Sequence, residues 1–113
     1  MTLSEIYNGL ENIFPKKVTN TTFGKGKAPE KPYVAIVDNG GDGFFADGKL
    51  YYIAREVGLE LYTSKKDLES ERKIEGWLEE HNILWNCDTD YIDEESAFKK
   101  TYNIEIDDTE VEE

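Results

Sequence analysis

The chain has 113 residues, a length that fits one domain with one modest hydrophobic core. Charged residues make up 34% and apolar residues 38%, the mean hydropathy is -0.67 and the formal net charge is -12. These values are typical of a soluble protein. A chain this acidic repels phosphate groups, which argues against a nucleic-acid-binding protein.

Membrane and disulfide signals are missing from the sequence. No apolar run reaches the ~20 residues that cross a bilayer, and the segment MTLSEIYNGL lacks the basic and then apolar order of a signal peptide. We therefore expect an intracellular protein with no membrane partner. Cys87 is the only cysteine, which excludes an internal disulfide and argues against a cysteine-based zinc site.

The charge is unevenly placed along the chain. Residues 1–63 carry seven Lys or Arg against eight acids, net -1, whereas residues 64–113 carry six against seventeen, net -11. One segment, from Pro15 to Lys31, is basic. It holds one acid, Glu30, and five lysines: Lys16, Lys17, Lys25, Lys27 and Lys31. We predict a long basic loop over residues 15–32, either a solvated connection or a segment that meets an acidic neighbour.

Helical spacing and a capping-box pattern at Thr2 and Glu5 predict a first helix from Thr2 to Phe14. Pro15 ends it. Gly9 weakens its middle by about 1 kcal/mol relative to alanine, so we expect this helix to depend on docking against a sheet.

An apolar run, Tyr33 to Val37, predicts the first strand, followed by a glycine-rich loop that presents Phe44 and Phe45. Asp47-Gly48 then predicts a tight hairpin turn. Residues 50–62 form one long strand or two short ones, and the expected core side chains share one parity, interrupted by Arg55: Tyr51, Ile53, Val57, Leu59 and Leu61.

The second half predicts a helix and two strands. The pattern SKKD, Ser64 to Asp67, predicts the start of a helix that runs to about His81, with Asn82 as the C-cap. A short strand over residues 83–85, an acidic loop over residues 87–95 and a strand over residues 98–106 follow, with Lys100 out of the alternating pattern. Residues 107–113 predict a solvated acidic tail.

This order of elements predicts an α+β fold, with a mainly antiparallel sheet of four to five strands and two helices packed on one face. We expect a single domain over residues 1–106. Its uncovered sheet face or free edges are natural surfaces for subunit contacts.

None of the candidate chemical motifs is complete. Asp38 to Gly43 resembles part of a calcium loop, but Gly40 stands at the third position and Lys49 at the twelfth, where ligands belong. Residues 24–27 lack phosphate-loop spacing, and neither His81 with Cys87 nor the acidic pairs come with the further groups that catalysis needs. We predict no catalytic, cofactor or metal site, and a protein that is not an enzyme.

Several segments together carry a family resemblance. TLSEIYNGL, KPYVAIV, FFADGKLYY, LELYTSKKD, ILW and YNIEI follow one another in an order that resembles the tail-terminator or tail-completion (head-tail joining) proteins of long-tailed, siphovirus-type bacteriophages and prophages of Gram-positive bacteria. The resemblance spans most of residues 2–106. FFAD and LELYT are its strongest pieces.

The resemblance implies a virion structural protein without catalytic residues or cofactors. Such proteins form a ring, typically a hexamer, at the head-proximal end of the tail tube, stop its polymerisation and join the tail to the head. The implied partners are further copies of the chain, the major tail tube protein and the head-tail connector or stopper protein. DNA would only pass through the channel. The implied location is the neck of the virion, and the host cytoplasm during assembly.

Candidate contact residues are the aromatic pair Phe44 and Phe45 and the lysines Lys16, Lys17, Lys25 and Lys27. We expect the basic segment of one subunit to approach the acidic half, residues 64–113, of the next. The alternative hypothesis is an acidic inhibitor or DNA mimic of the anti-restriction or immunity type, which rests on the net charge of -12.

Overall fold

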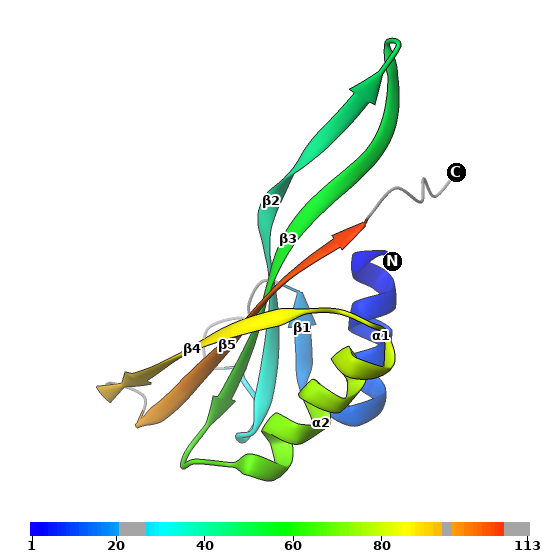
Figure 1. Cartoon of the computed structure of the whole chain (residues 1–113). Helices are drawn as coiled ribbons and strands as arrows, with labels where there is room; N and C mark the ends of the chain where they lie inside the picture. Colours follow the sequence, from blue (N-terminus) through cyan, green and yellow to red (C-terminus); the bar gives the residue numbers. More distant parts are fainter. Residues whose placement is uncertain (21–26, 94–95, 108–113) are drawn as a thin grey trace.

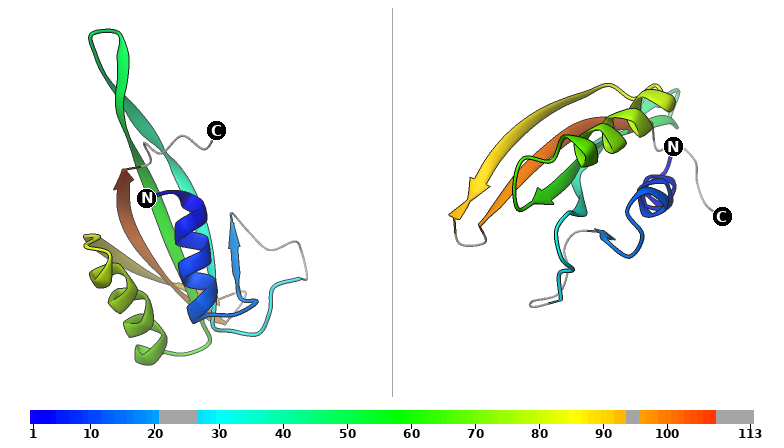
Figure 2. Two further views of the ribbon diagram at one scale, coloured as in Figure 1. Left: turned by 90° about the vertical axis from the view of Figure 1, so that its right-hand side faces the viewer. Right: turned by 90° about the horizontal axis from the view of Figure 1, so that it is seen from below.

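The computed structural model describes residues 1–20, 27–93 and 96–107. Over these residues the chain forms a five-stranded sheet in the order β1-β2-β3-β5-β4, with two helices on one face (Figures 1 and 2). β1 pairs with β2 in parallel, and the other three pairings are antiparallel. The predicted α+β class, mainly antiparallel sheet and helix placement are therefore confirmed. The elements are α1 (Leu3–Ile13), β1 (Val18–Asn20), β2 (Tyr33–Ala46), β3 (Lys49–Thr63), α2 (Leu68–Glu80), β4 (Trp85–Ile92) and β5 (Ala97–Asp107).

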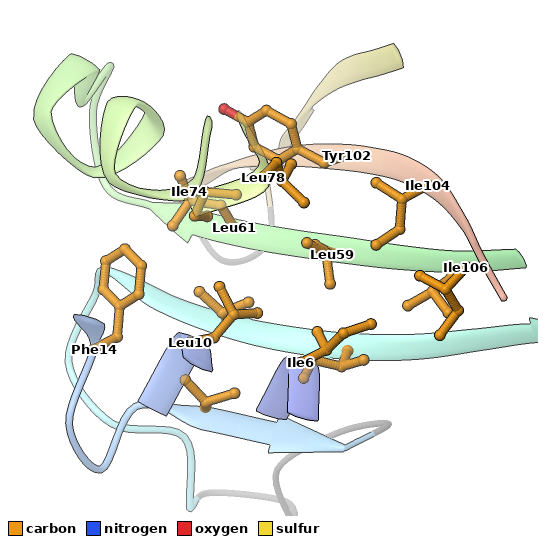
Figure 3. Close-up of a cluster of buried hydrophobic side chains, with 14 residues drawn as sticks. Ile6, Leu10, Phe14, Leu59, Leu61, Ile74, Leu78, Tyr102, Ile104 and Ile106 are labelled. Carbon is orange, nitrogen blue, oxygen red and sulfur yellow. The ribbon is translucent and has the colours of Figure 1, made fainter. Parts of the chain in front are cut away.

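The core lies between the two helices and the facing side of the sheet (Figure 3). Each helix contributes two fully buried side chains at helical spacing, Ile6 and Leu10 from α1 and Ile74 and Leu78 from α2. The sheet contributes alternate residues of its central strands: Val34, Ile36, Val57, Leu59, Leu61, Tyr102, Ile104 and Ile106. The predicted parity of the second hairpin strand is thus correct from Val57 to Leu61.

α1 begins as the sequence predicts and packs closely against α2. The Thr2 hydroxyl oxygen accepts a hydrogen bond from the Glu5 backbone N–H at 3.2 Å, which caps the helix. At Gly9 an added Cβ atom would lie 2.5 Å from the indole of Trp77 in α2. Glycine is therefore placed in this helix by packing, because only a residue without a side chain lets the indole approach so closely.

The predicted loop over residues 15–32 contains a strand, which corrects that prediction. β1 pairs with β2 from Val18 opposite Val34, and the Lys17 carbonyl oxygen accepts the Val34 backbone N–H at 2.8 Å. Val18 is 6% exposed and joins the core. Three residues are too few to show an alternating pattern, so pairing with β2 rather than local sequence defines this strand. Residues 21–26 lie outside the described residues.

α2 starts three residues later than the pattern SKKD predicts. Asp67, not Ser64, is its N-cap, and its carboxylate accepts hydrogen bonds from the backbone N–H and the hydroxyl of Ser70 at 3.1 and 2.8 Å. These bonds, the backbone one first, hold the pKa of Asp67 below its usual value.

The C-cap of α2 is His81, one residue before the predicted Asn82, and Asn82 is the left-handed residue that follows it. Asn82 has a φ of 56°, and its N–H bonds to the Glu79 carbonyl oxygen at 3.1 Å. The Ile83 N–H reaches the Leu78 carbonyl oxygen at 2.9 Å. This is the hydrogen-bond pattern of a Schellman motif, which ends a helix with a left-handed residue.

The predicted acidic loop over residues 87–95 is wrong as far as Ile92. β4 begins at Trp85, runs through Cys87 to Ile92 and pairs with β5 along its whole length. Residues 86–91 are exposed, because β4 is an edge strand, and so they show no apolar alternation. Asp107, which the sequence places in the tail, is the last residue of β5, and residues 108–113 lie outside the described residues.

The face of the sheet opposite the helices is largely polar. Lys99 forms an ion pair with Glu60 at 3.7 Å, Tyr33 and Tyr62 stack with ring centroids 4.8 Å apart, and Asn103 donates to Asn86 at 3.0 Å. These contacts link neighbouring strands and leave this face suited to water.

Candidate functional site: the β2–β3 arm

The β2–β3 hairpin extends beyond the rest of the sheet and forms a projecting arm (Figure 1). β5 reaches along β3 only as far as Ala54, so the strand segments on either side of the tip pair only with each other among the described strands. The molecule measures 51 × 29 × 24 Å, and the arm lies along the longest dimension. All side chains from residue 38 to residue 50 are exposed.

The tip is the tight turn that the sequence predicts. Asp47 and Gly48 have φ values of 52° and 74°, and Ala46 pairs with Lys49 across the turn. Two consecutive positive φ angles define the type I′ geometry, whose twist matches that of the flanking strands. The Asp-Gly signal is therefore confirmed.

The glycine-rich segment between residues 38 and 43 is part of β2, so the predicted loop is wrong. A β-bulge lies between Asp38 and Gly41, and Gly40 takes a φ of 97° there. The Asp38 carboxylate accepts the Gly40 N–H at 2.9 Å and pairs with Arg55 at 2.9 Å. Its oxygens thus hold the bulge and join the two strands.

An apolar strip follows one face of the arm. Phe45 and Leu50 are cross-strand partners, as are Gly43 and Ile53. A Cβ atom at Gly43 would lie 3.3 Å from Leu50 and 3.4 Å from the Phe45 ring, so both side chains lie over this glycine. Phe45 is 71% and Leu50 42% exposed.

This strip continues the core-facing side of the sheet. Ile53 and Arg55 share the parity of the buried Val57, and Arg55 pairs with the buried Ile106 of β5. Beyond that point the helices no longer cover the face (Figures 1 and 2). The arm therefore carries an uncovered extension of the apolar face.

Phe44 and Phe45 point to opposite faces of the arm, because successive residues of a strand alternate. Phe44 is 43% exposed, so neither ring reaches the core. Both rings are therefore exposed, one on each face of the arm.

The predicted lysines do not lie near the aromatic pair. Lys16 and Lys17 follow α1 at the end of the molecule opposite the arm tip, and Lys27 is exposed in the segment before β2 (Figure 1). The Lys16 N–H donates to the Glu11 carboxylate at 2.7 Å. Lys25 lies outside the described residues. The aromatic pair and the described lysines are thus two separate candidate contact regions.

A pocket of about 350 Å³ lies at the end opposite the arm tip, between the start of α2 and the strands β3, β4 and β5. We call it the distal pocket. Its buried or half-buried lining includes Leu61, Thr63 and Phe98, and its exposed lining includes Lys66 and Thr89. The sequence predicts that Phe98 points inward, but it does not predict the pocket, because most of β4 has the sequence of an acidic loop.

Polar groups on the core-facing side connect α2 to β5. The Tyr102 hydroxyl donates to Glu75 at 2.7 Å, and Lys100 pairs with Glu71. Burial, and next the bond to Glu75, raise the pKa of Tyr102. Burial alone would lower the pKa of Lys100, but the hydrogen bond to Glu71 together with the nearby negative charges, Glu71 first, outweighs burial, and the pKa is raised. Lys100 is out of pattern because it faces the acidic side of α2.

The remaining candidate residues have structural positions. His81 is the C-cap residue of α2, its Nδ1 lies 2.8 Å from the Trp77 carbonyl oxygen and its ring is 4.2 Å from the indole. Cys87 is exposed in β4. Among the described residues, no group of three or more His, Cys, Asp and Glu side chains is placed to hold a metal ion. No helix in this part of the chain is long and apolar enough to span a membrane.

Comparison with known proteins gives no family assignment: no family model matches the chain, and no curated protein matches its sequence.

Proposed function

We propose that this protein is a virion structural subunit of the tail-terminator type, which forms a ring at the head-proximal end of a phage tail tube, stops tube growth and joins the tail to the head connector. The observation that carries the proposal is the β2–β3 arm. It carries a strip of apolar side chains, the exposed Phe45 and Leu50 and the half-buried Ile53, on a continuation of the core-facing side of the sheet.

Such an arm has little to stabilise it when it is alone. A two-stranded ribbon is marginally stable in water, because it buries little apolar area. Exposure of Phe45 and Leu50 to water is unfavourable. A partner surface that covers them contributes about 25 cal/mol of favourable free energy for each Å² of apolar area removed from water. An arm of this kind is thus better explained by contact with another protein than by a role in isolation.

A ring also fits the form of the chain. A small subunit cannot close the end of a tube by itself, whereas identical head-to-tail contacts between copies close into a ring. The order of segments that resembles tail-completion proteins spans most of residues 2–106 and includes the FFAD segment of the arm. Both points support a structural subunit whose role is to bind other protein subunits.

The charge distribution supplies a second, weaker support. Lys16, Lys17 and Lys27 lie in the near-neutral half of the chain, whereas β4 presents Asp88 and Asp90 along an exposed edge. Opposite charges on different copies would favour and orient association, and salt would weaken it. Changing the lysines Lys16, Lys17, Lys25 and Lys27 to glutamate and measuring assembly mass against salt tests this part, and unchanged assembly refutes it.

Electron microscopy of the purified protein mixed with tail tubes, polymerised from the major tail protein encoded in the same gene cluster, tests the proposal directly. We expect rings at one end of each tube and an arrest of tube growth. A monomer that leaves tube length unchanged would refute it. Stoichiometric inhibition of a nuclease would instead support the acidic inhibitor hypothesis.

A further inference from the structure

The β2–β3 arm, with its apolar strip, projects from one end of the molecule (Figures 1 and 2), and the distal pocket lies at the other end. From this arrangement we infer that the arm of one copy inserts Phe45 and Leu50 into the distal pocket of the next copy. This inference names the subunit contact inside the ring proposed above and rests on that proposal, but it can be tested without a phage tail.

The pocket has the chemistry to receive the arm. Leu61 and Phe98 line it, and the volume of about 350 Å³ accepts an aromatic side chain. Exposed apolar groups lie on the neighbouring elements: Leu68, the first residue of α2, is 52% exposed, and Tyr91 is 54% exposed with its ring 5.0 Å from Phe98. Covering these groups and the arm together removes apolar area from water on both sides of the contact.

Charge selects the same pairing. The arm carries Asp42 and Asp47 against one base, Lys49, near its tip, and the chain as a whole holds 25 acids against 13 basic residues. The lining of the distal pocket is net positive: Glu71 is paired with Lys100, which leaves the exposed Lys66 without an opposing acid in the lining. An acidic tip is therefore attracted to this end of another copy, which favours a second copy of this chain as the occupant.

The geometry makes the contact head-to-tail. The arm tip and the distal pocket lie at opposite ends of the long axis, so a copy cannot fill its own pocket. Each copy can use its arm on one neighbour and its pocket on another. Repetition of such a contact gives a closed ring or an open filament, according to the rotation between copies.

Two single variants of the full chain test the contact. Phe45→Ser removes the ring that enters the pocket, and Thr89→Trp fills the pocket from β4. Both positions are exposed, so the fold should tolerate both changes, and circular dichroism checks this. In light scattering we expect each variant alone to have the mass of one chain, 13.0 kDa, and the wild type to have a larger mass because it assembles.

The decisive measurement is the equimolar mixture of the two variants. One has an intact pocket and the other an intact arm, so the mixture should form a heterodimer and nothing larger. Asn86→Trp is the matched control: it adds the same side chain at an exposed position three residues earlier in β4, on the other face, and should keep the wild-type mass. Lys66→Glu is a second pocket variant and should also give single chains.

The results that overturn the inference are clear. They are a wild type that stays at 13.0 kDa, single variants that keep the wild-type mass, or a mixture that stays monomeric. If rings of Phe45→Ser form and cap tail tubes normally, the arm contact is wrong and the proposed function stands. If the variants behave as expected but the wild-type assembly ignores tail tubes, the proposed function fails and the arm contact stands.

Discussion

Replacing Gly9 by alanine should destabilise the protein, although the same change in most helix interiors stabilises it. Alanine is favoured over glycine in a helix by about 1 kcal/mol. Here the new Cβ atom would lie 2.5 Å from Trp77 atoms, a distance that real Cβ atoms do not adopt, so the indole or the helix must move. Overpacking of this kind costs about 1–3 kcal/mol. The net loss of folding free energy is then about 1 kcal/mol.

Gly76 provides the matched control. It lies inside α2, and an added Cβ atom there would meet no other atom within 4 Å. Gly76→Ala should therefore show the helix preference alone and stabilise the protein by about 1 kcal/mol. The two variants should differ by about 2 kcal/mol, or about 8 °C in Tm, since about 1 kcal/mol corresponds to about 4 °C in a domain of this size.

Urea denaturation followed by circular dichroism measures both variants, and a double-mutant cycle identifies the cause. In a Trp77→Ala background the obstacle is gone, so Gly9→Ala should become stabilising. A Gly9→Ala protein as stable as Gly76→Ala would refute the packing argument. If Gly9→Ala still destabilises the Trp77→Ala protein, contact with the Trp77 indole is not the cause.

Three further changes follow from local contacts. Tyr102→Phe removes the hydroxyl that donates to Glu75 at 2.7 Å and should lower the free energy of unfolding by about 2 kcal/mol, whereas Tyr91→Phe, at an exposed ring, should leave it unchanged. Asp67→Ala should cost about 1 kcal/mol in urea denaturation, because α2 loses its cap. Because folding lowers the pKa of Asp67 below 3.8, its ionised carboxylate stabilises the fold above about pH 4, and this part is lost as the pH falls through the lowered value; Asp67→Asn should remove that pH dependence. Gly48→Val strains the turn at a φ of 74° and should speed amide hydrogen exchange in the arm with little change in global unfolding.

Sequence patterns predicted most elements that face the core. They missed β1, which has only three residues, and the strand segments that face water on both sides. α1 and β5 show clear periods, because one side of each is buried. β4 and residues 38–46 of β2 are strands only through pairing with a neighbour, so their side chains need not alternate. The glycines of β2 resemble a loop for the same reason.

The candidate site was predictable in composition but not in geometry. The exposure of Phe45 follows from its polar, glycine-rich surroundings, whereas its pairing with Leu50 depends on a bulge between Phe44 and Phe45. That bulge places one extra residue on β3 and sets which side chains share a face. No local pattern shows it, because register is a property of two strands.

The arm can change in sequence independently of the core. Among the described side chains, the buried core contains none from residues 38–56, so the body does not depend on the arm for its stability. Substitutions on the arm can then alter what it contacts while the free energy of unfolding stays nearly constant. Phe45→Ser should accordingly change association and leave urea denaturation of the single chain unchanged, as expected for a segment whose role is to match a partner.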